Sequence, residues 1–282
     1  MTVAAPPQRA ATVPRAVHER PPSNRRVILS LARVEGRKLL RHPVFLAGIA
    51  LSVIVVFLAG NSEFRGTHSV VEPLWPTGFP IGPLAVFGFV ATNLAAMRDR
   101  LHGTEELFGS TAAPRRVRTA ALLGSAAWAT IAGIVLLAPF VGVFAVAHGV
   151  SRPDVIKLLE EPLIVAILAL AGVALGRLLP TRLAAPIAAF FTFVLVAGYA
   201  HPTLPWQFLA LWVIPDSLPS VGWHMLYLVG IGIFVATLAL MKDGVCRSLV
   251  VAAAIGVLAV ATGAILQLPA FCAGGGTPCM FG

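Results

Sequence analysis

The chain has 282 residues, of which 57% are hydrophobic and only 12% charged, and its formal net charge is +9. In a soluble protein such a charge would suggest nucleic acid as a partner. Here the cations flank long apolar segments, so the expected partner is anionic membrane lipid and not nucleic acid.

A membrane span needs about 20 largely apolar residues, because the hydrocarbon core is about 30 Å thick and a helix rises 1.5 Å per residue. The segments that meet this need are 43–60, 79–97, 119–147, 163–180, 183–200, 223–241 and 248–268. The sequence therefore predicts an all-α membrane protein with about seven transmembrane helices.

The distribution of Lys and Arg predicts the orientation. With the N-terminus inside, 18 of the 21 Lys and Arg residues lie on the inner side, and only Arg65, Arg152 and Lys157 lie outside. Acidic residues divide six and six, as expected when orientation follows the cations. We expect a multi-pass plasma-membrane protein with a cytoplasmic N-terminus and an outside C-terminus.

The segment before the first span divides in two. Residues 1–26 are rich in Pro, Ala and Arg, which predicts a disordered cytoplasmic tail. Residues 27–42 predict an amphipathic helix in the membrane interface, although an ordinary basic flank of the first span is almost as good an interpretation. Its basic face carries Ser30, Arg33, Arg37 and Arg41, and its apolar stripe carries Val27, Leu31 and Val34.

The longest inner loop, 98–118, lies between spans two and three and predicts a short surface helix. Thr104 can cap this helix, with Glu105 and Glu106 in its first turn, where carboxylates favour the positive end of the helix dipole. Leu107 and Phe108 would then be exposed on the cytoplasmic surface. On this segment alone, they could enter the lipid interface or dock into another protein.

Three further features follow along the predicted six-span core, 43–241. The third span is long and is expected to tilt or kink near Pro139, and Gly172 and Gly176 in the fourth favour close packing within the chain. The outer segment 201–222 has an apolar centre too short to cross and predicts a re-entrant or surface helix.

The C-terminal part, 242–282, adds the seventh span and an outer tail. Cys272 and Cys279 both lie on the predicted outer side, where thiols oxidise, so we favour a disulfide over two unpaired thiols.

Groups that carry chemistry are scarce. The predicted span interiors contain almost no ionisable residues, and Glu160 and Glu161 are placed in an outer loop. The milder polar groups in the spans, among them Thr92 and Asn93, are expected to bond helix to helix. No phosphate-binding loop, zinc-protease motif or nucleophile elbow occurs, so we expect no cofactor and no catalytic activity in this chain.

One constellation of outer residues offers an alternative. His201, Asp216 and His224 lie around the re-entrant segment, and imidazole and carboxylate suit zinc. Their spacing matches no ligand pattern, so solvated interfacial histidines are the favoured interpretation.

The order of these parts resembles the permease subunit of a type-2 ATP-binding-cassette exporter. The matching pieces are LARVEGRKLLRHPVFLAGIALS (31–52), RLHGTEELFGSTAAPRRVRTAALL (100–123) and the segment 201–224, and the second is similar to the inner loop of actinobacterial members. The chain departs from the family pattern of six spans and a cytoplasmic C-terminus.

The resemblance implies a dimer of permease copies, working with a separate cytoplasmic ATPase to move an amphipathic substrate. The coupling helix would contact the ATPase through Thr104, Glu105, Glu106, Leu107, Phe108 and Ser110. Two alternatives stay open. One is a membrane-embedded enzyme that acts on a lipid-linked substrate through His201, Asp216 and His224, and the other is a non-transporting membrane anchor.

Overall fold

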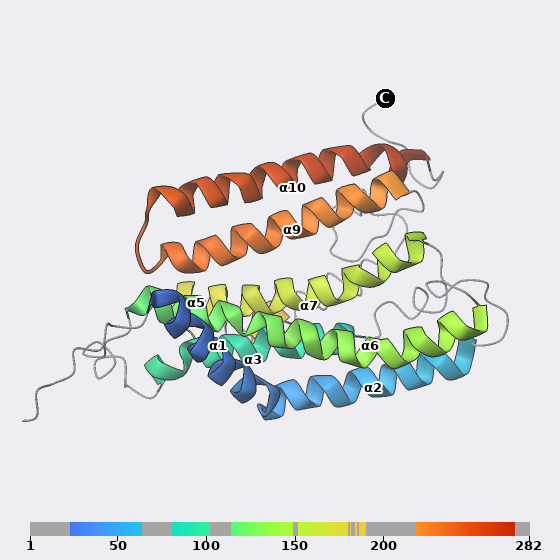
Figure 1. The fold of residues 1–282 in the computed structure, drawn as a ribbon, viewed down its shortest axis with the longest axis horizontal. Coiled ribbons are helices and arrows are strands. Elements are labelled where there is room, and N and C mark those ends of the chain that lie inside the picture. Colours follow the sequence, from blue (N-terminus) through green and yellow to red (C-terminus); the bar gives the residue numbers. More distant parts are fainter. Residues whose placement is uncertain are drawn as a thin grey trace, which may run out of the picture.

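The computed structural model describes residues 23–63, 81–101, 114–148, 152–179, 181, 184, 186–189 and 218–273 (Figure 1). Within these residues the regular structure is entirely helical, as the sequence predicts. The helices are α1 (Asn24–Leu40), α2 (Pro43–Glu63), α3 (Gly82–Leu101), α5 (Arg115–Gly124), α6 (Ala126–His148), α7 (Arg152–Leu178), α9 (Leu218–Met241) and α10 (Arg247–Ala273).

Four described helical segments are long and apolar enough to cross a membrane. They are Arg115–Pro139, Leu159–Leu178, Gly222–Met241 and Arg247–Gln267. A fifth candidate is the bent pair Asn24–Leu40 and Pro43–Val55, whose axes differ by 60°. The fold is therefore compatible with a membrane-embedded protein, but the predicted count of seven is not confirmed. The fifth predicted span, 183–200, falls mostly outside the described residues.

The helix ends differ from the predicted spans at two places. The third predicted span is divided into α5 and α6 at Ser125, whose hydroxyl donates a hydrogen bond to the carbonyl of Leu122 at 2.6 Å. Pro139 lies within α6, which continues past it to His148. The fourth predicted span, 163–180, overlaps the candidate span Leu159–Leu178, and the helix that carries it, α7, extends back to Arg152.

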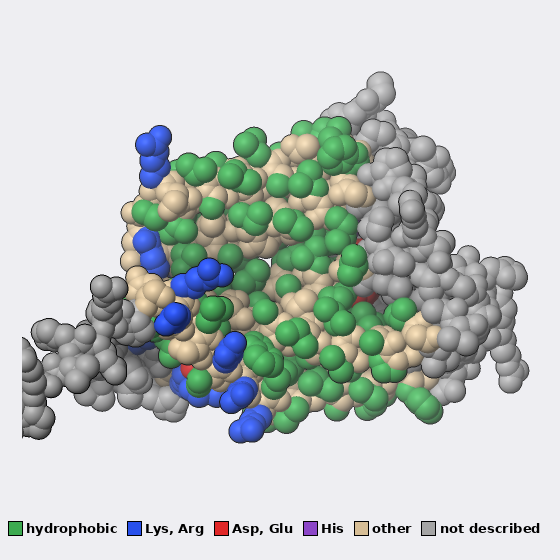
Figure 2. Space-filling view, viewed as in Figure 1, with side chains coloured by type: hydrophobic (Ala, Val, Ile, Leu, Met, Phe, Trp, Pro, Cys, Tyr) green, Lys and Arg blue, Asp and Glu red, His purple; other side chains and the backbone are tan. Residues whose placement is uncertain are grey.

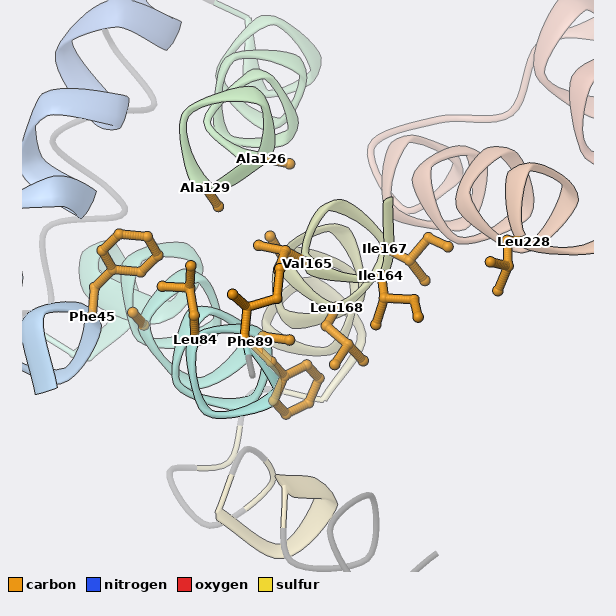
Figure 3. Close-up of a cluster of buried hydrophobic side chains, with 14 of the residues drawn as sticks. Phe45, Leu84, Phe89, Ala126, Ala129, Ile164, Val165, Ile167, Leu168 and Leu228 are labelled. Atoms are coloured by element: carbon orange, nitrogen blue, oxygen red, sulfur yellow. The ribbon is translucent and has the colours of Figure 1, made fainter. Parts of the chain in front are cut away.

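The bundle is organised around α7, which packs against α3 on one side and α9 on the other (Figure 1). Its buried residues Ile164, Val165 and Leu168 meet Leu84 and Phe89 of α3 in the hydrophobic core (Figure 3). The core extends to Phe45 of α2, Ala126 and Ala129 of α6, and Leu228 of α9.

Small residues bring α3 and α7 into close contact. A Cβ added at Gly172 would overlap the backbone of Phe89, and one at Gly176 would lie 2.9 Å from the carbonyl oxygen of Asn93. Thr92 also donates a hydrogen bond to the carbonyl of Ala169 at 2.9 Å, and the Asn93 amide donates to the carbonyl of Gly172 at 3.2 Å. The predictions that these glycines pack within the chain, and that these polar groups bond helix to helix, are confirmed.

Glycines also bring α9 and α10 into close contact. A Cβ at Gly230 of α9 would lie 2.7 Å from the backbone nitrogen of Val260 in α10. In return, one at Gly263 of α10 would lie 2.6 Å from the backbone nitrogen of Tyr227. Because the two backbones are in contact, polar side chains one turn away can also meet across this interface.

The predicted interfacial helix is α1, which lies at an angle to the bundle (Figure 1). Its buried residues are Ala32, Gly36 and Leu39, and a Cβ at Gly36 would overlap the ring of Trp128 in α6. The basic face predicted for this helix is exposed. Val34, from the predicted apolar stripe, is also exposed, as a side chain that faces lipid would be.

Candidate functional site

Most of the residues predicted to carry function lie outside the described part of the chain. This applies to Thr104, Glu105, Glu106, Leu107, Phe108 and Ser110 of the coupling loop, to His201 and Asp216, and to Cys279. The backbone of Cys272 lies in the last turn of α10, but its side chain is not described. What the structure does describe is both flanks of the coupling loop, at the end of α3 and the start of α5.

These flanks lie at one end of the bundle, which we call the basic end. It comprises α1, the end of α3, the start of α5 and the turn 242–246 between α9 and α10. Figure 2 shows the Lys and Arg side chains gathered at this end. The C-terminal ends of α2, α6 and α10 and the N-terminal ends of α7 and α9 lie at the opposite end of the bundle (Figure 1).

The start of α5 is tied to the turn between α9 and α10. The Arg116 guanidinium donates a hydrogen bond to the carbonyl of Gly244 at 2.6 Å, and the Thr119 hydroxyl donates one to the carboxylate of Asp243. Gly244 has a φ of +134°, which a side chain would strain. The segment that follows the coupling loop is therefore anchored to a turn more than 100 residues away in the sequence.

The segment that precedes the coupling loop is tied to α1. The Glu35 carboxylate accepts hydrogen bonds from Lys38 at 3.1 Å and from Arg98 of α3 at 3.2 Å. Both pairs border a groove of about 270 Å³ between α1 and α3. The groove is lined by Glu35, Lys38, Leu39, His42, Ala91, Leu94, Ala95 and Arg98.

This groove combines a cationic rim with an apolar floor. Its lining includes the cationic side chains of Arg98 and Lys38, which are 39% and 53% exposed, and the apolar side chains of Leu39 and Leu94. The Nδ1 atom of His42 is buried without a hydrogen-bond partner among the described residues. Such a surface suits a phosphate-bearing, partly apolar molecule such as a membrane lipid.

A second group of polar residues lies toward the opposite end of the bundle, and we call it the buried polar cluster. It consists of Glu160 from α7, His224 from α9 and Gln267 from α10. The His224 Nδ1 atom lies 3.0 Å from the amide oxygen of Gln267, and its Nε2 atom lies 3.3 Å from a carboxylate oxygen of Glu160. The side chains of His224 and Glu160 are only 1% and 3% exposed.

The buried polar cluster corrects two predictions. His224 was expected to be a solvated interfacial histidine, but it is enclosed by three helices. Glu160 and Glu161 were expected in an outer loop, but both lie in α7, which begins eight residues before Glu160; Glu160 is buried and Glu161 is partly buried. The sequence contained one signal for the burial of Glu160. Glu160 shares a helical face with Ile164 and Ile167, and these two apolar residues are buried in the structure.

The cluster is not a recognisable metal centre. Within the described ranges, no three His, Cys, Asp or Glu side chains are grouped so that they could hold a metal ion. The zinc alternative involving His201 and Asp216 falls partly outside these ranges. What Glu160 and His224 can do where they stand is exchange a proton, because imidazole and carboxyl groups both titrate and here face each other directly.

Comparison with protein-family models, with curated proteins and with solved structures finds no match to this chain.

Proposed function

We propose that this chain is the permease subunit of an ATP-driven exporter, works with a separate cytoplasmic ATPase, and moves an amphipathic substrate. In this proposal the basic end faces the cytoplasm of a plasma-membrane protein, and the C-terminus lies outside. A second permease copy completes the substrate path. ATP hydrolysis takes place on the partner, since the chain has no phosphate-binding loop.

The observation that carries this proposal is the anchoring of the loop 98–118 on both sides. Arg98, the first residue of the loop, is paired with Glu35 of α1. Arg116, near its end, and Thr119, directly after it, hold the turn between α9 and α10. A partner that pushes on this loop would therefore act on α1, α5 and the α9–α10 hairpin together, as a coupling element must.

The position of α1 supports the same mechanism. Gly36 and Ala32 place α1 directly on α6 and α5, so a movement of α5 also reaches the interfacial helix. Rigid, closely packed elements transmit displacement better than loosely packed ones, because interiors at near-crystalline density resist compression. The fold thus links the loop to helices on both sides of α7.

The enzyme alternative is not favoured by any observation. Its residue His224 is 1% exposed and enclosed by α7, α9 and α10, so its imidazole does not reach a substrate at the outer surface. The anchor alternative is separated from the exporter by function, because an anchor would recruit a partner whose ATP turnover ignores candidate substrates.

The test is to purify the tagged chain from its native host in mild detergent and to identify the proteins that co-purify. We expect a stoichiometric ATPase with a phosphate-binding loop, and we expect Phe108→Asp to abolish its recovery. The matched control is Ser30→Asp, which adds the same charge to an exposed position of α1 outside the loop. A well-folded preparation without an ATPase would contradict the proposal.

A further inference from the structure

The buried polar cluster links three helices through polar side chains inside the bundle. One polar side chain comes from each of α7, α9 and α10, and Gln267 is fully buried. Ile164 and Leu228 follow Glu160 and His224 by one helical turn and are also fully buried, and Figure 3 shows these two side chains on the neighbouring helices α7 and α9. Ionisable groups in such surroundings are costly to bury, and in membrane proteins they commonly mark pathways for protons or ions.

The donor and acceptor roles of the side chains in the cluster determine how many protons it holds. With the Gln267 amide oriented so that its oxygen, an acceptor only, faces Nδ1, this nitrogen carries a hydrogen. The Nε2 atom faces a carboxylate oxygen of Glu160, and two bare acceptors at 3.3 Å would repel each other. A further proton must therefore lie between His224 and Glu160, on the imidazole or on the carboxyl group.

We propose that Glu160, His224 and Gln267 form a proton-binding site inside the helix bundle, which holds one proton beyond a neutral imidazole and an ionised carboxylate. A proton is the ligand that fits, because all three side chains are buried and each imidazole nitrogen already faces an oxygen, at 3.0 Å from Gln267 and 3.3 Å from Glu160. Gln267 orients the imidazole, and Glu160 and His224 share the bound proton.

Among the described residues, the titratable groups next to the cluster are Glu161 and Tyr227. Glu161 follows Glu160 on α7, and its Oε2 atom is buried with no hydrogen-bond partner among the described residues. Tyr227 of α9 lies beside the imidazole, with ring centroids 5.8 Å apart. From α10 the facing group is the neutral amide of Gln267. The described surroundings thus add a second carboxyl group and no additional cation next to the site.

The site has a mechanical consequence. When the proton is bound, it links α7 to the α9–α10 hairpin. When the proton is lost, a carboxylate oxygen faces an imidazole lone pair, and their repulsion pushes α7 away from α9. Gly263 keeps Gln267 in place, because it lies one turn earlier, where the backbones of α9 and α10 are in contact. Protonation therefore controls the contact between α7 and the hairpin.

The first test uses the purified chain alone in detergent or nanodiscs, so it does not depend on the proposed ATPase. Nitrogen-15 NMR of labelled histidine, with His224→Gln to assign the signal, reports which ring nitrogens are protonated at pH 6. Infrared spectroscopy, compared with Glu160→Gln, reports whether the carboxyl group is protonated. We expect one proton on Nδ1 and a second on Nε2 or on Glu160.

A singly protonated imidazole beside an ionised Glu160 at pH 6 would overturn the proposal. That result would mean that the Gln267 amide is turned, with its NH₂ group donating to Nδ1.

The second test measures the consequence. The unfolding midpoint of the wild-type chain is expected to fall as the pH rises and the proton is lost. Glu160→Gln, which keeps size and hydrogen-bonding capacity, should remove this dependence, whereas Glu35→Gln at the basic end should retain it. An equal pH dependence in all three proteins would overturn the proposed coupling.

Discussion

The two ends of this helix bundle place their charged groups in opposite ways. At the basic end, Lys38 and Arg98 are 53% and 39% exposed, and both pair with Glu35 at the surface. Toward the other end, Glu160 and His224 are 3% and 1% exposed and pair inside the bundle. The basic end thus has many exposed cations, whereas the opposite end has a few ionisable groups that are buried.

This difference decides what each group can contribute. Exposed ion pairs are screened and contribute little to stability, so their value lies in facing lipid headgroups or a partner. A buried pair is weak evidence for stability, but removing one partner is costly because the other charge is left without compensation. Changes at the two ends should therefore have very different consequences.

The largest effect is expected from Glu160→Ala. It removes the carboxylate that faces the buried His224 imidazole, and removing one member of a comparable buried pair costs about 3–5 kcal/mol. Glu35→Ala is the matched change at the basic end, and the loss of exposed pairs costs about 0–1 kcal/mol. Unfolding in a mixed detergent series measures both. Similar losses for the two variants would erase the distinction between the ends.

The next largest effect is expected from Gly263→Leu. The new side chain would meet the backbone of α9, with its Cβ 2.6 Å from the Tyr227 nitrogen and 2.7 Å from the Trp223 oxygen. Overpacking of this kind costs about 2–3 kcal/mol. Because Gln267 follows one turn later, the variant should also change the His224 signal in the nitrogen-15 spectrum.

Gly142→Ala is the control for that change. Gly142 lies in α6, and a Cβ there would meet nothing within 4 Å. Alanine is favoured over glycine in a helix interior by about 0.5–1 kcal/mol, so this variant should be slightly more stable than the wild type. A destabilised Gly142→Ala protein would mean that a contact outside the described residues covers this position.

The sequence predicts the fold and the basic end better than the buried polar cluster, and the reason is physical. Apolar length and cation placement are local properties, so the helices and the basic face of α1 could be predicted from short windows. G-x-x-x-G spacing likewise predicts the contact of Gly172 and Gly176. Residues 160, 224 and 267 come together only when three helices pack, and no short window of the sequence contains more than one of them.

The break at Ser125 shows a second limit. The segment 119–147 is largely apolar, so its hydropathy predicts one continuous helix. Ser125 separates α5 from α6, in a region where α1 packs on both helices. The Gly124-Ser125 pair is a local signal for such a division, but hydropathy does not register it.

A smaller effect is expected from Ser52→Ala. The fully buried Ser52 of α2 accepts a hydrogen bond from the backbone N–H of Leu84 at 2.9 Å, in the first turn of α3. First-turn N–H groups have no partner within their own helix, and losing a side-chain cap costs about 1 kcal/mol.

The matched control for Ser52→Ala is Ser30→Ala, on the exposed face of α1. Within the described part of the chain its hydroxyl donates one hydrogen bond, to the carbonyl of Val27 three residues earlier, so the change should stay within about 0.5 kcal/mol. Unfolding curves of the two variants compare a buried and an exposed hydroxyl directly. Equal destabilisation by the two would contradict the assigned cap.

The smallest effect concerns Cys246, in the turn at the basic end. Hydrogen bonds from the Ser248 hydroxyl, 3.1 Å from the sulfur, and from the Leu249 N–H lower the pKa of the Cys246 thiol. A lower pKa means more thiolate at neutral pH, and the thiolate is the form that reacts with maleimide. Ser248→Ala should therefore slow labelling at pH 7 by about twofold, as expected for a modest loss of thiolate.

The same labelling reports the orientation of the basic end. In a background with Cys272→Ser and Cys279→Ser, a membrane-impermeant maleimide should label Cys246 in inside-out vesicles and not in right-side-out ones. The difference between wild type and Ser248→Ala should vanish once the pH exceeds both thiol pKa values, because both thiols are then fully ionised. Labelling from the outer side would reverse the orientation of the whole bundle, and would place the cations of the basic end away from the proposed ATPase.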